Sequence, residues 1–323
     1  MRRFSFIDAH VDTITRAILP VNNVGLYENH LQLDFKRLSQ FKAPVQVFAL
    51  WLLDDLIADG LNRTNKMIDF FMAQVQAHED LIEVALNLDD MERIASKEKI
   101  SALLSLEGGE ALMGELSNLD HFYNKGIRLI GLAWNRENEL SHAPTSVDGP
   151  GLKPFGIDVV RRMNELGMIV DVSHLNEAGF WDVANNSKRP FIASHSNAYE
   201  VIAHRRNLKD DQIFAIVESD GLIGVVFEPT FLRSDDAHPS IDDLLEHIRH
   251  FIKIGAGDHI GLGSDFDGFI DGIVEGGAKI PTGLEDVSSM SFLEKRLTEE
   301  FGQEQALKIM YKNFHDFFKR YYS

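Results

Sequence analysis

Residues that commonly bind divalent metal ions stand at or just after the ends of five short apolar runs in this sequence. These residues are His10, Asp12, Glu107, His174, His195 and Asp265. His10 and Asp12 are two positions apart, so in an extended chain their side chains would project from the same face. An imidazole and a carboxylate that converge in this way suit a divalent ion such as zinc. The chain contains no cysteine, so any metal ion must be held by His, Asp and Glu.

Several of these residues have a structural alternative. A buried Glu107 is costly unless it is paired or bound to a metal ion, and Arg128 on the next apolar run is its alternative partner. His174 and His195 could be core histidines with satisfied nitrogens, but two histidines at adjacent run ends favour a metal site.

The carboxylates near these runs also leave a choice of roles. Asp267 has the same expected facing as Asp265, so either could be the functional residue. Asp265 is preferred because it directly abuts the apolar run. Asp8 and Asp171 lie one pleat deeper in their runs and are candidates for orienting the ligand histidines.

The number of candidate ligands favours two metal ions over one. A catalytic zinc ion takes about three protein ligands and keeps one position open. The three histidines with Asp12, Glu107 and Asp265 exceed that number. A carboxylate can bridge two ions, which lie about 3.5–4 Å apart in two-metal hydrolases, so the set predicts a binuclear site.

The elements that would position these residues alternate along the chain. Apolar runs typical of strands buried on both faces cover 4–8, 45–52, 102–107, 127–134, 168–174, 190–195, 222–227 and 259–265. Segments with the apolar spacing of helices cover 61–81, 156–167, 176–186, 208–221 and 240–257. This alternation predicts the α/β class and a (β/α)8 TIM barrel, whose active-site residues gather at the carboxyl ends of the strands. A doubly wound open sheet is the competing architecture, but the first run lacks the Gly-rich phosphate turn that would favour it.

Composition is that of a globular protein. The 323 residues are 44% hydrophobic, and we expect a single barrel domain over 1–323 with C-terminal helices, about 284–323, packed on it. Aromatic residues in that part are expected to serve packing or a subunit interface, which would allow a homodimer. The net charge of −18 argues against nucleic acid or an anionic membrane surface as a partner. No secretory run, membrane span or C-terminal anchor signal is apparent, so the expected location is the cytoplasm.

Six motifs occur in order, namely DAHVDT at 8–13, SLEGGE at 105–110, DVSHLN at 171–176, ASHSNAY at 193–199, HRRNL at 204–208 and GLGSDFDG at 261–268. On these motifs the chain resembles the membrane (renal) dipeptidase family of zinc metallopeptidases over nearly its full length. The resemblance implies two Zn²⁺ ions per chain, with Glu107 bridging them as part of the catalytic machinery. It assigns one ion to His10 and Asp12 and the other to His174 and His195.

The resemblance also implies further roles. A hydroxide bridging the two zinc ions would attack the scissile carbonyl of a dipeptide, and Asp265 would handle the proton passed to the leaving amine. Arg206 matches the family arginine that binds the free C-terminal carboxylate of the dipeptide, although Arg205 beside it could take this role.

Two positions depart from the mammalian pattern of that family. Trp134 stands where the mammalian enzymes carry a histidine credited with stabilising the tetrahedral intermediate. A tryptophan N–H donates one hydrogen bond but cannot become cationic, so Asn135 or His142 are candidates for the missing donor. We therefore expect Trp134 and Asn135 on the substrate side of the site. Glu228 replaces a substrate-side tyrosine, and its carboxylate would favour a basic or free amino group of the substrate.

These features predict a zinc dipeptidase that hydrolyses small dipeptides, with L,D-dipeptides as one substrate option. One alternative is another binuclear-metal barrel amidohydrolase, an amidase or a deaminase. Many of those have His-x-His after the first strand and a modified lysine after the fourth, whereas this chain has His-x-Asp and no lysine there. A second alternative is a non-catalytic binding protein with a metal site, which the intact Asp265 argues against. The loop 135–156 is a candidate lid over the pocket.

Overall fold

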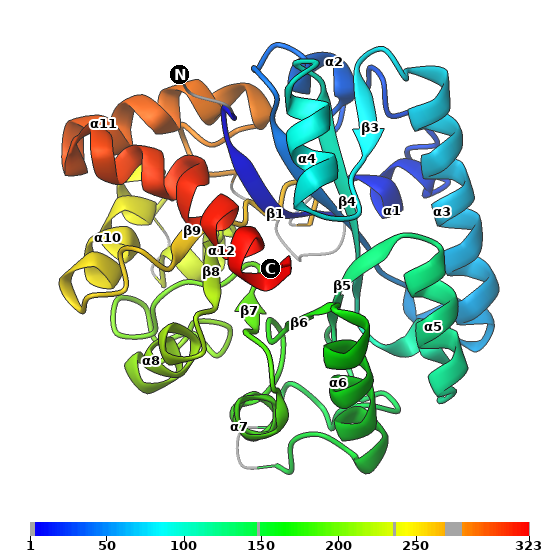
Figure 1. The fold of residues 1–323 in the computed structure, drawn as a ribbon. Coiled ribbons are helices and arrows are strands. Elements are labelled where there is room, and N and C mark those ends of the chain that lie inside the picture. The colour runs from blue at the N-terminus through cyan, green and yellow to red at the C-terminus, as the bar shows by residue number, and fades with distance from the viewer. Residues whose placement is uncertain (1–3, 147–148, 235–236, 269–279, 323) are drawn as a thin grey trace.

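The computed structural model describes residues 4–146, 149–234, 237–268 and 280–322. In these residues eight parallel strands close into a barrel surrounded by helices (Figure 1). The barrel strands are β1 (Ile7–Val11), β2 (Val45–Leu50), β4 (Ile100–Glu107), β5 (Ile127–Gly131), β6 (Ile169–Asp171), β7 (Ile192–Ala193), β8 (Leu222–Val225) and β9 (Ile260–Leu262). Pairing of β1 with β9, and of β2 with β1 and β4, closes the ring. The predicted (β/α)8 barrel is therefore confirmed.

Several strands differ in extent from the apolar runs that predicted them. The expected strand 4–8 is wrong in its bounds, because β1 begins at Ile7 and includes His10. Strands β6 and β7 contain only three and two residues. The chain beyond β6 and β8, such as Val172 and Phe227, stays buried after regular strand geometry ends, so the apolar run outlasts the strand. A short unexpected strand, β3 (Ile82–Val84), pairs with the start of β4 outside the ring.

The five expected helices are present, with bounds that differ by a few residues. They are α3 (Gly60–Ala77), α6 (Pro154–Leu166), α7 (Glu177–Asn186), α8 (Asp210–Glu218) and α10 (Ile241–Lys253). The described residues also contain α1 (Thr13–Ile18), α2 (Phe35–Leu38), α4 (Leu88–Ala95), α5 (Leu116–Asn124), α9 (Pro229–Leu232), α11 (Met290–Leu307) and α12 (Asn313–Tyr322).

Local sequence explains where the helices next to the candidate site begin and end. Helix α6 has Pro154 at its first position and ends at Gly167, whose φ of 70° favours glycine. Helix α7 is capped by Asn176, whose side-chain oxygen accepts the backbone N–H of Gly179 at 2.8 Å. Helix α6 thus begins after the loop that follows β5, and helix α7 begins after the loop that follows β6.

Alternation along β4 shows how the barrel separates its core from its site. Ala102, Leu104 and Leu106 belong to the apolar cluster that also includes core residues of α3 and α5. Leu103 belongs instead to a cluster with residues of α12, and Ser105 and Glu107 follow it on the same face. On this face, apolar Leu103 in the middle of β4 is thus followed by polar residues toward the carboxyl end of the strand.

Helix α12 covers the amino end of the barrel and lies across its centre in Figure 1. Its buried residues pack on first residues of the strands, including Ile7, Val45, Ile169, Ile192 and Leu222. The helix contributes Phe314, Phe317, Phe318 and Tyr321. The packing role predicted for C-terminal aromatic residues is confirmed for these four. No helix among the described residues is long and apolar enough to cross a membrane.

Candidate metal centre

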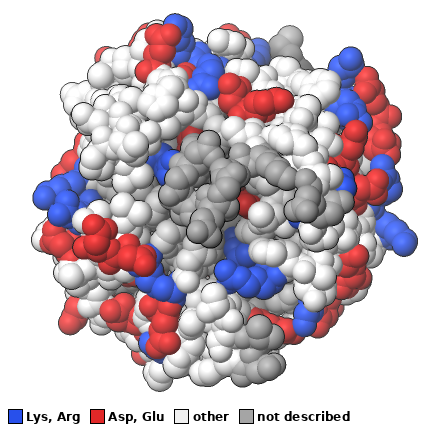
Figure 2. All heavy atoms as spheres, turned by 180° about the vertical axis from the view of Figure 1, so that it is seen from behind, with Lys and Arg blue, Asp and Glu red and all other residues white. Residues whose placement is uncertain are grey.

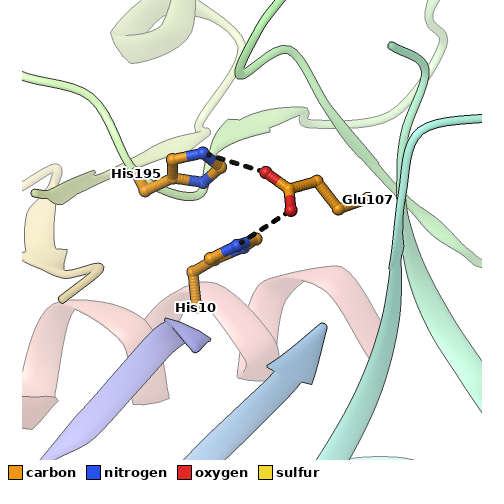
Figure 3. A group of neighbouring side chains, drawn as sticks. All are labelled: His10, Glu107 and His195. Atoms are coloured by element: carbon orange, nitrogen blue, oxygen red, sulfur yellow. Dashed lines mark ion pairs between the residues drawn. The ribbon is translucent and has the colours of Figure 1, made fainter. Parts of the chain in front are cut away.

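The carboxylate of Glu107 lies between two histidines that are far apart in the sequence. His10 comes from β1, Glu107 ends β4, and His195 follows β7 (Figure 3). The Nε2 atom of His10 lies 3.6 Å from Oε2 of Glu107, and Nε2 of His195 lies 3.4 Å from Oε1. Each oxygen of this single carboxylate therefore faces a different imidazole.

The remaining predicted ligands divide between the two sides of Glu107. Nε2 of His174 lies 2.9 Å from Oε1 of Glu107 and 3.0 Å from Nε2 of His195. On the other side, Nε2 of His10 lies 3.4 Å from Oδ1 of Asp12. The two sides correspond in residues to the two ligand groups that the resemblance implies, namely His10 with Asp12 and His174 with His195.

Buried polar atoms in this cluster lack hydrogen-bond partners among the described residues. They are Nε2 of His10, Oδ1 of Asp12, Oε2 of Glu107 and Nδ1 of His174. Such an unsatisfied atom costs about 1–3 kcal/mol, more when it is charged. Donor atoms of His10, Glu107 and His195, and of His10, Asp12 and Asp265, lie within 4.8 Å of one another in each group. A divalent cation would satisfy these nitrogen and oxygen donors, so the residues fit a metal centre.

The carboxylates of the cluster repel one another in a buried environment. Burial and the charge of Glu107 raise the pKa of Asp12 to about 7. Burial and Asp12 raise the pKa of Asp265 well above its usual range. Burial also disfavours ionised Glu107, but the imidazoles of His10 and His174 outweigh it and hold its pKa well below its usual range. This crowding of negative charge is relieved by bound cations.

The histidines differ in their protonation. Burial and the charge of Arg206 lower the pKa of His174 to about 4. Burial and His10 lower the pKa of His195 well below its ordinary value. Burial also opposes protonation of His10, but Glu107 raises the pKa of His10 well above its ordinary value. Two neutral imidazoles thus offer lone pairs, and the proton on His10 occupies a place that a cation can take.

Two of the candidate residues adopt backbone conformations that are rare for non-glycine residues. His174 has a φ of 72° and Asp265 a φ of 61°. Such strain is held in place by surrounding structure and is concentrated at functional sites. The backbone N–H of Asp265 donates to the carbonyl of His10 at 3.0 Å, which ties the loop after β9 to β1. A Cβ on Gly268 would lie 2.2 Å from Oδ1 of Asp265 and 2.7 Å from Oδ2 of Asp12, so a larger residue there would have to displace these two carboxylates.

A serine that sequence reasoning missed links Asp171 to the histidines. The hydroxyl of Ser194 donates to Oδ2 of Asp171 at 2.5 Å and lies 2.7 Å from Nδ1 of His195. Because its proton goes to Asp171, the hydroxyl accepts the Nδ1 proton of His195 and leaves Nε2 unprotonated toward Glu107. The same oxygen lies 3.5 Å from Nδ1 of His10. Asp171 was expected to orient a histidine, and it does so through Ser194.

Two other carboxylates have structural partners. Asp8 accepts the backbone N–H and the hydroxyl of Ser264 at 2.8 and 2.6 Å, so it joins β1 to the end of β9. Among the hydrogen bonds of the described residues, Asp8 has none to an imidazole nitrogen. Asp267 accepts the hydroxyl of Thr13 at 2.6 Å and the backbone N–H of Gln32 at 2.7 Å. These bonds occupy Asp267, which supports the choice of Asp265 as the functional carboxylate.

The alternative partner of Glu107 is not used. The guanidinium of Arg128 donates to the carbonyls of Leu86, Tyr123 and Ile127 at 2.8–3.0 Å. Glu107 instead meets the histidines of the cluster. The alternative prediction of a salt bridge between Glu107 and Arg128 is therefore wrong.

Arg206 lies beside the cluster, whereas its neighbour Arg205 is exposed. One Nη of Arg206 lies 3.5 Å from the carbonyl oxygen of His195, and its guanidinium stacks 5.3 Å above the ring of Phe231. Its Nε is buried without a partner among the described residues. A buried guanidinium with free donors suits a carboxylate ligand, so Arg206 is favoured over Arg205 for that role.

Trp134 and Asn135 follow β5, which neighbours β4 in the sheet. The ring of Trp134 stacks on Trp51 at 4.7 Å, and the guanidinium of Arg136 lies 5.1 Å from its centroid. Asn135 is exposed. His142, the other candidate donor, lies 3.7 Å from the carboxylate of Glu137. These contacts leave the expected substrate roles of Trp134 and Asn135 as predictions.

Glu228 and the loop 135–156 also lie near the site. One carboxylate oxygen of Glu228 accepts the backbone N–H groups of Thr230 and Phe231 at 2.7 and 3.1 Å and so caps α9. Within the loop, the carbonyl of Pro150 accepts the side-chain amide of Asn176 at 3.0 Å. The loop therefore rests against the start of α7, at the edge of the site.

A (β/α)8 barrel with this donor cluster at the carboxyl ends of its strands defines the class of metal-dependent hydrolases. The sequence profile of the family described as membrane dipeptidase, peptidase family M19, matches residues 1–320. The chain belongs to this family. The resemblance seen in the six motifs is thus confirmed.

Known proteins similar to this chain include one solved with a mimic of a dipeptide. A metallopeptidase from Rhodobacter sphaeroides, liganded with a phosphinate mimic of the dipeptide L-Ala-D-Ala, superposes with a TM-score of 0.88 and 27% identity over 98% of this chain and 99% of that chain. Dipeptidase tcpJ of Claviceps purpurea is 31% identical over 293 residues, which are 87% of this chain and 67% of that protein. An uncharacterised Klebsiella pneumoniae protein from the pqqA 5′ region is 36% identical over 243 residues, 72% of this chain and 86% of that protein.

Proposed function

We propose that this protein is a dipeptidase with a binuclear zinc centre. The observation that carries this proposal is the position of Glu107, which presents one carboxylate oxygen to His10 and the other to His174 and His195. His10 and Asp12 would hold one ion, and His174 and His195 the other. When bound, the two ions would activate a water molecule at neutral pH and polarise the scissile carbonyl.

Asp265 is the residue that we assign to proton transfer. Its Oδ1 lies 3.8 Å from Nε2 of His10, and it forms a group of neighbouring donors with His10 and Asp12. Its carboxyl would take a proton from the attacking water and pass it to the leaving amine nitrogen. A carboxyl whose pKa is raised by burial and by Asp12 is suited to hold that proton near neutral pH.

Arg206 would bind the free C-terminal carboxylate of the dipeptide. Its guanidinium is buried and in the field of the cluster, where a bidentate pair with a carboxylate excludes water and fixes the peptide bond. Glu228, whose capping bonds use one carboxylate oxygen, is a candidate contact for the free amino group. A dipeptide carries both end groups, which is why we favour it over larger peptides.

We include L,D-dipeptides among the substrates because the similar metallopeptidase of known structure was solved with a mimic of L-Ala-D-Ala. Zinc is proposed because nitrogen and carboxylate donors without thiolates suit it. A cytoplasmic location and a homodimer remain predictions from the sequence.

A panel assay tests the proposal. L,L- and L,D-dipeptides, their N-acetylated forms and simple amides are incubated with the protein as purified, after chelation, and after Zn²⁺ is restored. We expect hydrolysis of dipeptides that chelation abolishes and Zn²⁺ restores, with N-acetylated forms poor substrates. Turnover of amides but of no dipeptide would instead support the amidohydrolase alternative.

A further inference from the structure

A pocket of about 260 Å³ opens beside the candidate metal centre. Its lining includes the buried residues His174 and Arg206, and also Arg205 and Lys209. The start of α7 contributes Asn176 and Glu177 to the lining. The pocket therefore contains the groups assigned to metal and to the α-carboxylate together with further polar side chains.

The charge of this lining is opposite to that of the whole chain. The chain carries a net charge of −18, whereas the pocket is lined by Arg205, Arg206 and Lys209 with Glu177 as its one carboxylate. Glu177 is already paired with Lys209, whose Nζ lies 2.7 Å from its Oε2. Since Arg206 is assigned to the α-carboxylate and Lys209 is paired with Glu177, Arg205 is the remaining basic residue of the lining for a further negative group of the substrate. Figure 2 shows a group of basic side chains beside the centre of the face opposite to that in Figure 1.

A polar atom in the wall is also without a partner. Oγ of Ser196, which lines the pocket, is buried and has no hydrogen-bond partner among the described residues. Nε of Arg206 is unpartnered as well, but it is already assigned to the α-carboxylate. A ligand side chain with an acceptor oxygen could satisfy Ser196, because a hydroxyl donates. Arg205 has no ion pair within the described part of the chain and is exposed.

We propose that this pocket receives the side chain of the C-terminal residue of the substrate, and that Arg205 selects a carboxylate there. The preferred substrates are then dipeptides that end in aspartate or glutamate. The inference rests on the proposed function, because Arg206 must bind the α-carboxylate for the neighbouring side chain to reach Arg205. An arginine–carboxylate pair joins two opposite charges and can be bidentate, whereas the isosteric amide carries no charge and offers only one acceptor oxygen to the guanidinium.

The test compares acidic dipeptides with their isosteric amides on the metal-loaded full chain. The kcat/KM values of alanyl-glutamate and alanyl-glutamine, with the C-terminal residue in both L and D forms, are measured for the wild type, Arg205→Gln and Arg205→Glu. A matched control is Arg161→Gln, an exposed arginine on α6 outside this pocket. We expect the wild type to favour glutamate about tenfold, which corresponds to about 1.4 kcal/mol.

Arg205→Gln should bring the ratio of the two kcat/KM values close to one, and Arg205→Glu should reverse it, while Arg161→Gln keeps the wild-type ratio. A ratio near one in the wild type, or one unaffected by Arg205→Gln, would overturn the inference and leave the dipeptidase proposal standing.

Calorimetric binding of free glutamate and glutamine separates the two claims. If no dipeptide is hydrolysed, the proposed function fails, and an Arg205-dependent preference for glutamate would still support the pocket assignment. Equal binding of both amino acids would overturn it.

Discussion

The two oxygens of Glu107 face different histidines, so this one carboxylate contacts both groups of candidate ligands. Replacing Glu107 with glutamine keeps the shape but removes the charge and one lone-pair acceptor. We expect Glu107→Gln to bind fewer metal ions and to lose more than about 100-fold in kcat/KM, since even outer partners of metal ligands cost 10–100-fold. Metal content by elemental analysis and dipeptide turnover measure this. Glu79→Gln, an exposed change on the loop after α3, serves as the control, and full activity in Glu107→Gln would contradict the bridging role.

Ser194 sets the orientation and tautomer of His195 through a hydrogen bond at 2.7 Å, while Asp171 accepts the proton of its hydroxyl. We expect Ser194→Ala to weaken metal affinity by about 10–100-fold without unfolding the chain, because the imidazole loses its fixed direction. Competition with a chromophoric chelator gives the affinity. Ser219→Ala removes a hydroxyl that bonds only locally and should leave the affinity unchanged. Equal affinities in both variants would refute the positioning role of Ser194.

At the level of single residues, the candidate metal ligands could be predicted from the sequence. The residues that orient them through hydrogen bonds were harder to predict. His10, Glu107, His174 and His195 could be selected because each stands at or after a buried strand, where an ionisable side chain needs a reason. Ser194 gave no such signal, since a hydroxyl beside a histidine is common and its partner Asp171 is 23 positions away.

The strands position the candidate ligands at one end of the barrel, and α12 covers the other end. The side chain of Phe317 is fully buried in the cluster that α12 forms with the amino ends of the strands. We expect Phe317→Ala to lower the free energy of unfolding by about 3–5 kcal/mol, as is usual for a buried phenylalanine. Chemical denaturation measures it. Phe214→Ala, at a residue 44% exposed on α8, should change stability by less than about 0.5 kcal/mol. Similar losses in both variants would contradict the sealing role of α12.

Elements were predicted from the sequence where apolar runs were long, and missed where they were short. The alternation of runs indicated the barrel, but β3 has only three residues and includes Glu83, so no apolar run marks it. The strand ends were misplaced because burial continues past the last regular pair, as at Val172 after β6. Helix bounds were closer, since caps such as Asn176 and stops such as Gly167 are visible in the sequence.

The stability of the whole molecule should depend on pH through buried histidines outside the cluster. Burial lowers the pKa of His247 from 6.5 to about 4, and its Nδ1 accepts the backbone N–H of Ala198 at 3.2 Å. The unfolded chain takes up this proton below pH 6.5 and the folded chain does not, so stability is complete above 6.5 and falls as pH decreases toward 4. The loss from this residue is on the order of 3 kcal/mol.

His247→Asn keeps an acceptor for Ala198 but does not titrate. The unfolding free energy of this variant should therefore change less between pH 7 and about 4 than that of the wild type. The slope of unfolding free energy against pH should be smaller in the variant by up to about 1.4 kcal/mol per pH unit. Urea denaturation across this range gives the comparison. Identical pH dependence in both proteins would show that His247 is not held neutral in the fold.

At the scale of the whole molecule, the central claim is that one closed barrel brings two ligand groups to a single carboxylate and so forms a two-ion hydrolytic centre. The most direct test is a titration of the chelated protein with Zn²⁺, in which bound metal and dipeptide hydrolysis are followed together. We expect hydrolysis to rise with bound metal and to reach its plateau at two ions per chain. A plateau at one ion, or dipeptide hydrolysis that persists in the metal-free protein, would contradict the claim.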